Sequence, residues 1–259
     1  MRALVINLDA ATERLEMMRT QLDALEIDWE RLDATGLAQI DPPLGDRIWQ
    51  SWERPLRQTE MAGMCSHLLA WQRVSDSGQP WLILEDDALL DKSVPTFLET
   101  VSGLAGLEHI SLETRGRAKY LDPKPHSKAP IQRLRLDRSG AAAYVLWPSG
   151  ARKLVARSAK TRGLADALLC AEPGLRSWQA VPALAIQLDQ CAHYGAPAPI
   201  ATVSQIDALA IPTRERTIRQ RIRRVLSQLR MGIRQVGPKS VRTDVLPKGD
   251  WVLDTNAAS

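Results

Sequence analysis

The chain has 259 residues, 44% of them hydrophobic, which fits one large domain with a substantial core, or one domain and an appendage. Its three cysteines are odd in number and form no CxxC pair, which argues against a disulfide framework or a cysteine zinc site. The net charge of +4 is unevenly distributed along the chain. Residues 214–242 carry ten Lys or Arg and one Glu (+9), so the charges of the remaining residues sum to −5.

The first 36 residues predict a strand, a helix and a second strand. Residues 3–8 (ALVINL) are a short apolar run typical of a buried parallel strand. Apolar residues then recur at spacings of three and four over residues 10–25, which predicts an amphipathic helix. Residues 27–36 resemble a second strand that ends at a glycine turn. This order predicts a right-handed crossover and a parallel sheet.

A second helix and a central strand follow. Residues 59–78 have the apolar spacing of a helix, which Gly78 and Pro80 would end. Residues 81–90 (WLILEDDALL) begin with four apolar residues, which predict a buried central strand. The three acids behind them therefore lie at the carboxyl end of that strand, where open α/β sheets bind their ligands.

The remaining pattern completes an α/β fold with a mostly parallel central sheet flanked by helices. We expect a helix at 93–104, a strand at 109–113, a mobile loop at 114–132, a strand at 141–147 followed by a helix, and a last strand at 177–188. Residues 211–235 alternate apolar residues with arginine, which predicts a basic amphipathic helix. The predicted division is a domain at 1–205 and a basic helical appendage at 206–259.

The acidic triplet of Glu85, Asp86 and Asp87 has two interpretations. Adjacent carboxylates raise one another's pKa or recruit a cation. Mg²⁺ and Mn²⁺ bind through one or two carboxylates together with substrate phosphates, so the triplet is consistent with a divalent metal that bridges the protein and a diphosphate. Alternatively, one of the aspartates caps the segment that follows. The triplet alone does not distinguish between the two.

Four stretches in the same order resemble glycosyltransferase family 25, the bacterial lipooligosaccharide galactosyltransferases and their relatives. They are VINLDAATERLEMM (5–18), TEMAGMCSHLLAW (59–71), LILEDDA (82–88) and AAAYVLWPSGARKLV (141–155), and LADALL (164–169) corresponds to a later aspartate segment of the family. Two features depart from the family pattern. Of the family's Arg-Arg-Pro-Asp-Arg turn only Arg14 remains, and the proline before the late aspartate is missing.

The resemblance implies a GT-A-like fold that binds a nucleotide-sugar donor at the carboxyl ends of the strands. It implies Asp86 and Asp87 as ligands of Mn²⁺ or Mg²⁺, which would stabilise the leaving diphosphate. It also implies two catalytic residues. Asp166 would take the proton of the acceptor hydroxyl, and Glu85 would orient the two aspartates through hydrogen bonds. The alternative for Asp166 is an ordinary acid on a surface helix.

Seven further residues are candidates for donor binding on the same resemblance: Asn7, Asp9, Arg14, Asp33, Glu60, Ser66 and His67. Several have structural alternatives. Asp9 could cap a helix, Arg14 could be a solvated helix charge, and His67 could be a buried structural histidine. His193, after the last strand, could complete a metal site.

The expected function is metal-dependent transfer of a hexose, galactose from UDP-galactose, onto a lipooligosaccharide or other surface glycan. A non-catalytic nucleotide-sugar-binding protein and a metal-dependent phosphoesterase are the alternatives. Residues 214–242 suit an anionic membrane surface, or a helix packed on the domain. They contain no aromatic residue for base stacking, so no nucleic acid partner is expected. With no apolar run long enough for a transmembrane helix and no signal peptide, we expect a cytoplasmic protein, peripheral on the inner face of the inner membrane.

Overall fold

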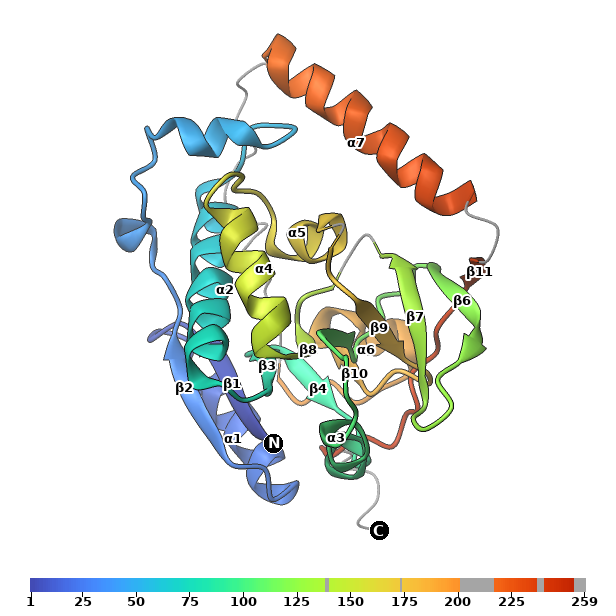
Figure 1. The fold of residues 1–259 in the computed structure, drawn as a ribbon. Coiled ribbons are helices and arrows are strands. Elements are labelled where there is room, and N and C mark those ends of the chain that lie inside the picture. Colours follow the sequence, from blue (N-terminus) through green and yellow to red (C-terminus); the bar gives the residue numbers. More distant parts are fainter. Residues whose placement is uncertain (138–139, 173, 201–216, 237–239, 254–259) are drawn as a thin grey trace.

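A computed structural model describes residues 1–137, 140–172, 174–200, 217–236 and 240–253. Within them the chain forms a nine-stranded sheet of order β11-β6-β7-β9-β5-β8-β3-β1-β2 and a two-stranded sheet of β10 and β4. Helices lie along both faces of the large sheet (Figure 1).

The elements have the following bounds. The strands are β1 (Arg2–Asn7), β2 (Trp29–Asp33), β3 (Trp81–Glu85), β4 (Ala88–Leu90), β5 (His109–Ser111), β6 (Lys119–Pro125), β7 (Ile131–Leu136), β8 (Ala143–Leu146), β9 (Ser177–Ala180), β10 (Ala185–Gln187) and β11 (Val241–Thr243). The α-helices are α1 (Thr12–Ala24), α2 (Gln58–Ser77), α3 (Val94–Ser102), α4 (Pro148–Ser158), α5 (Ala165–Ala171), α6 (Cys191–Tyr194) and α7 (Ile218–Val236). Short 3-10 helices are η1 (Leu37–Gln39), η2 (Arg47–Ser51) and η3 (Leu188–Gln190).

The large sheet is mixed, but most of its strands share one direction. β1 is parallel to both β2 and β3, and β5 is parallel to β9. β8 runs antiparallel between β3 and β5, and β7 and β11 are the other reversed strands. The prediction of an α/β fold with a mostly parallel sheet and flanking helices is therefore confirmed, with β8 as a reversed strand at its centre.

Alternation along the central strands fills a core on each face of the sheet. Ala3 and Val5 of β1 pack with α1 and α3 on one face, while Leu4 and Ile6 pack with α2, α4 and α5 on the other. β3 is buried along its apolar residues for the same reason, because a sheet covered on both faces needs continuous hydrophobic strands. Helix α2 ends where the sequence indicates, at Gly78, whose φ of 70° is left-handed.

The mobile loop expected at 114–132 is wrong, because β6 and β7 form an antiparallel pair there. Lys119, the first residue of β6, is buried. The ammonium of Lys119 donates to the Gln179 side chain at 2.6 Å and to the Glu113 carbonyl at 2.9 Å, and it pairs with Asp137. The single last strand expected at 177–188 is also two strands, β9 and β10, in different sheets.

The predicted basic helix is confirmed as α7 for residues 218–236, and the remainder of its predicted N-terminal part lies outside the described residues. The division predicted between residues 205 and 206 also falls outside them and stays a prediction. After α7 the chain returns to the domain, because β11 pairs with β6 and Trp251 is buried in the core. Within the described ranges, none of the helices has the length and hydropathy needed to cross a bilayer.

Candidate active site

The acidic triplet lies where the sequence predicts, at the carboxyl end of the central strand β3. Glu85 is the last residue of β3, and Asp86 and Asp87 form the turn into β4. Hydrogen bonds to neighbouring strands fix this turn, because the Glu85 N–H donates to the Ala142 carbonyl and the Leu188 N–H donates to the Asp87 carbonyl. The three carboxylates therefore project from a rigid edge of the sheet.

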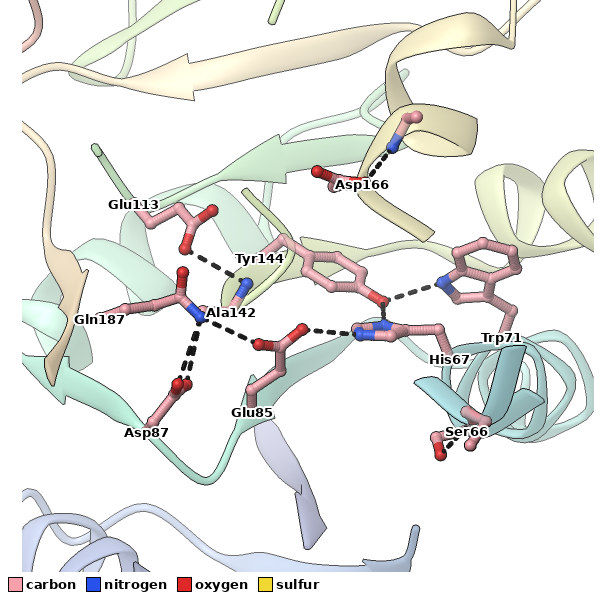
Figure 2. Close-up of polar contacts among 12 residues, drawn as sticks. Ser66, His67, Trp71, Glu85, Asp87, Glu113, Ala142, Tyr144, Asp166 and Gln187 are labelled. Atoms are coloured by element: carbon pink, nitrogen blue, oxygen red, sulfur yellow. Dashed lines mark hydrogen bonds and ion pairs between the residues drawn. The ribbon is translucent and has the colours of Figure 1, made fainter. Parts of the chain in front are cut away.

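Glu85 is held at both carboxylate oxygens (Figure 2). One oxygen lies 2.9 Å from Nε2 of His67, and the other accepts a hydrogen bond of 3.1 Å from the Gln187 amide. His67 comes from α2 and Gln187 ends β10, so two distant segments meet on this one carboxylate. His67 is 3% exposed, and its ring contacts the triplet through Glu85.

Asp87 differs from Glu85 in having few donors among the described residues. Its carboxylate is partly exposed and receives only long hydrogen bonds, of 3.3 and 3.4 Å, from Gln187. Burial, together with the charges of Glu85 and Asp86, raises the pKa of Asp87 to about 7. The hydrogen bonds from Gln187 and the charge of Arg14 oppose this shift without cancelling it.

Asp86 is engaged at both of its oxygens. The Asn7 amide donates to one at 2.8 Å, and the Arg14 guanidinium donates to the other at 3.1 Å. Burial raises the pKa of Asp86 above its usual value, although these two donors oppose the shift. The sequence predicts Asn7 and Arg14 as donor-binding residues, which stays a prediction. In this structure both contact Asp86, and the Asn7 side chain is itself buried.

Arg31 connects the predicted polar residues at the ends of β1 and β2, and sequence analysis missed it. Its guanidinium donates to the Asn7 side chain at 3.0 Å and pairs with Asp9 and with Asp33. Both aspartates are largely exposed. The only signal in the sequence was the two-residue spacing from Asp33, which puts Arg31 on the same side of β2.

Glu60 and Ser66 lie on α2, and both have protein partners. Arg54 binds the Glu60 carboxylate through two nitrogens, at 2.7 and 2.8 Å, and the Arg57 N–H donates to it. Burial opposes ionisation of Glu60, but these donors hold its pKa below the usual value. The Ser66 hydroxyl is buried, accepts from the Thr35 N–H and donates to the Ala62 carbonyl. It fixes the segment after β2.

Asp166 lies in the first turn of α5, on the face of the sheet that α2 and α4 cover. Burial raises its pKa to about 6, and the charges of Glu85 and Asp137 act in the same direction. The adjacent Ala167 N–H donates to it at 2.6 Å. Figure 2 shows Asp166 in the same part of the fold as Glu85 and Asp87, and its raised pKa makes it a stronger base than an ordinary aspartate.

Glu113 is a further acid in this region that sequence analysis did not identify. It follows β5, and it shares a row of the sheet with Ala142 and Glu85, because the Ala142 N–H donates to Glu113 and the Ala142 carbonyl accepts from Glu85. Its side chain is fully buried, which raises its pKa well above the usual value. The signal that could have found it is its position, because Glu113 is the last residue of the strand predicted at 109–113.

Among the residues that the structure describes, no group of three or more His, Cys, Asp or Glu side chains is arranged to hold a metal ion. His193 contacts the Tyr194 ring, and the metal site considered for it from the sequence stays a prediction. A cation held by one or two carboxylates and the phosphates of a substrate needs no such group. The chemistry of Asp87, a partly exposed carboxylate with weak donors, fits that kind of site.

Comparison with known proteins gives one family and a general likeness of fold. The sequence profile of glycosyltransferase family 25, described as an LPS biosynthesis protein, matches residues 1–169. No curated protein matches the chain.

Two solved structures are similar at low identity. The inositol-1-phosphate CTP transferase of T. maritima has a TM-score of 0.40 and 13% identity, over 78% of this chain and 91% of that one. A Drosophila beta-1,4-galactosyltransferase 7 mutant, in complex with manganese, UDP-Gal and xylobiose, has a TM-score of 0.37 and 12% identity, over 84% of this chain and 80% of that one.

Proposed function

Since this chain belongs to glycosyltransferase family 25 and is a glycosyltransferase, we propose that it transfers galactose from UDP-galactose to a lipooligosaccharide or other surface glycan, with Mn²⁺ or Mg²⁺ bound at Asp87. The observation that carries the proposal is the contrast between the three acids at the end of β3. Glu85 and Asp86 have donors at both oxygens, whereas among the described residues Asp87 has only long contacts with one amide.

A divalent cation at Asp87 would neutralise the diphosphate of the donor as it leaves. The residues of the chain around it support an anionic ligand. Arg14 and Arg31 bring two guanidinium groups to the ends of β1 and β2, and planar guanidinium groups suit phosphate oxygens. Asn7, Asp9 and Asp33 lie beside them, where the nucleoside of the donor would bind.

Asp166 is the proposed base. As the acceptor oxygen attacks the anomeric carbon, its proton passes to the Asp166 carboxylate, and the bond between that carbon and the diphosphate oxygen breaks to release UDP. A pKa of about 6 leaves most of this carboxylate ionised at neutral pH while making it more basic than a free aspartate. The family resemblance further implies inversion at the anomeric carbon.

The test is release of UDP from a series of UDP-sugars, with acceptor oligosaccharide, in the presence and absence of Mn²⁺. We expect release with UDP-galactose and Mn²⁺, and loss of at least a hundredfold in Asp87→Asn. Asp76→Asn removes an exposed carboxylate from α2 and serves as the matched control, with unchanged activity. Equal activity of Asp87→Asn and the wild type would refute the assignment of the cation to Asp87.

We also propose that α7 docks on an anionic membrane surface, where a lipid-linked acceptor would lie. Five apolar side chains of α7 are 47–76% exposed: Ile218, Ile222, Val225, Leu226 and Leu229. Arginines lie between them, and the segment 214–242 carries a charge of +9. One arginine, Arg223, donates to the Gln50 carbonyl of the domain at 2.8 Å. An exposed apolar stripe beside a basic surface is typical of helices that lie in the membrane interface.

Co-sedimentation with vesicles tests this docking. The wild type is expected to bind vesicles with 30% anionic lipid and to lose binding in the double variant Ile222→Glu and Leu229→Glu. Leu246→Glu changes an equally exposed leucine outside α7 and should bind as the wild type does. Equal binding of the double variant and the wild type would contradict docking through α7.

A further inference from the structure

A chain of hydrogen bonds runs through the core from α2 to Glu85. The Trp71 indole N–H donates to the Tyr144 hydroxyl at 2.8 Å, the hydroxyl lies 3.0 Å from Nδ1 of His67, and Nε2 of His67 lies 2.9 Å from Glu85. Trp71, Tyr144 and His67 are 0, 1 and 3% exposed. Figure 2 shows the four side chains in line, with the Tyr144 hydroxyl between the indole and the imidazole.

The chemistry of the residue at its start fixes the direction of this chain. An indole N–H is a donor only, so the Tyr144 oxygen accepts from Trp71. The Tyr144 proton then has Nδ1 of His67 as its acceptor, and Nε2 of His67 carries the ring proton and donates it to Glu85. In the opposite tautomer Trp71 and Nδ1 of His67 would both donate to the Tyr144 oxygen. The buried Tyr144 proton would then lose its acceptor in this series of hydrogen bonds, at a cost of about 1–3 kcal/mol.

A second chain reaches the other oxygen of Glu85 with its direction fixed in the same way. A guanidinium is a donor only, and Arg115 donates to the side-chain oxygen (Oε1) of Gln187. The amide nitrogen of Gln187 therefore faces the site, where it donates to Glu85 and to Asp87. Glu85 accepts from both sides, from His67 and from Gln187.

We infer that Tyr144 and His67 are positioning residues that fix the orientation of the Glu85 carboxylate, and that Glu85 in turn keeps the Gln187 amide directed at Asp87. The inference rests on the proposed function for the role of Asp87. It gives His67 a role through Glu85 in place of the contact with the donor that the sequence predicts. Removal of a group that orients the ligands of a metal commonly lowers activity 10- to 100-fold.

The direction of the hydrogen bonds is tested by nitrogen NMR of the protein labelled at histidine. The chain has four histidines, and the His67 signals are those absent from His67→Gln. We expect Nε2 of His67 to carry a proton and Nδ1 to carry none at pH 7.5. A proton on Nδ1 would overturn the inference. This result does not depend on any transferase activity, so it decides the inference even if the proposed donor is wrong.

Kinetics then tests the positioning role. Tyr144→Phe is expected to lower kcat about 10- to 100-fold and to change the donor KM less than about threefold. His67→Gln offers an amide that can accept from Tyr144 and donate to Glu85, so it should retain at least ten times the kcat of His67→Leu. Equal kcat in the Gln and Leu variants of His67, or full activity in Tyr144→Phe, would overturn the inference. If Tyr144→Phe does not fold, the comparison of the two His67 variants still tests it.

Discussion

Replacement of Asp166 by asparagine should stabilise the fold while removing the proposed base. Burial raises the pKa of Asp166 from 3.8 to about 6, so the folded protein binds this proton more tightly than the unfolded chain does. The ionised carboxylate therefore costs stability, and the cost grows as pH rises from about 4 to about 6 and is complete above that range. A shift of about two pK units corresponds to about 3 kcal/mol. Because the side chain is partly exposed, solvent screening reduces this to about 1–3 kcal/mol.

Urea unfolding of the wild type and Asp166→Asn at pH 4 and pH 8 measures this effect. The variant should be more stable by about 1–3 kcal/mol at pH 8 and equal to the wild type at pH 4, while Asp76→Asn changes little at either pH. Transfer by the wild type should rise with pH through about 6 and reach a plateau, and the variant should lose about 10²- to 10⁴-fold. A stability difference that is the same at both pH values would refute the argument from burial, and full activity of the variant would refute the assignment of the base.

Two further predictions concern the frame around the site. Gly140→Ala should lower stability by about 3 kcal/mol, because φ is 118° and the added Cβ would lie 1.7 Å from the Glu113 carboxylate. The helical Gly63→Ala, with nothing within 4 Å, should raise stability by up to about 1 kcal/mol, and thermal unfolding of the pair tests the contrast; equal shifts would contradict it. Arg31→Met should lower stability by about 1–2 kcal/mol and raise the donor KM severalfold. Urea unfolding and steady-state kinetics measure the two effects, and an unchanged KM would show that Arg31 has no role in donor binding.

Local sequence predicts part of the site, through the hydrophobic pattern of the strands and the positions where the strands end. Four apolar residues before Glu85 predict a buried strand, and the end of that strand places the acids at the edge of the sheet. The same reasoning places Asn7 beside them, because β1 pairs in parallel with β3. The confirmed elements are therefore those that a short stretch of sequence determines, and they include the central parallel strands β1 and β3.

The residues that sequence analysis missed act across long separations. Gln187 is 102 positions from Glu85, and Tyr144 is 77 from His67. No local pattern indicates which buried glutamine or tyrosine will meet a given acid. The loop expected at 114–132 is the opposite case, because Lys119 in that stretch is bound by Asp137 and Gln179 in the interior. Tertiary contacts decide these cases, and composition does not reveal them.

The reversal of β8 has a consequence for how this enzyme could diversify. A strand that runs against its neighbours begins at the edge where they end, so residues 140–142, directly before β8, lie beside the acids, and Ala142 binds both Glu85 and Glu113. In an all-parallel sheet that connection would arrive at the opposite edge. Exchanges at the start of β8 can therefore alter the surroundings of Glu85 and Glu113 while the pairing of β1 with β3 stays unaltered, so this strand can vary at the site without change to the parallel strands.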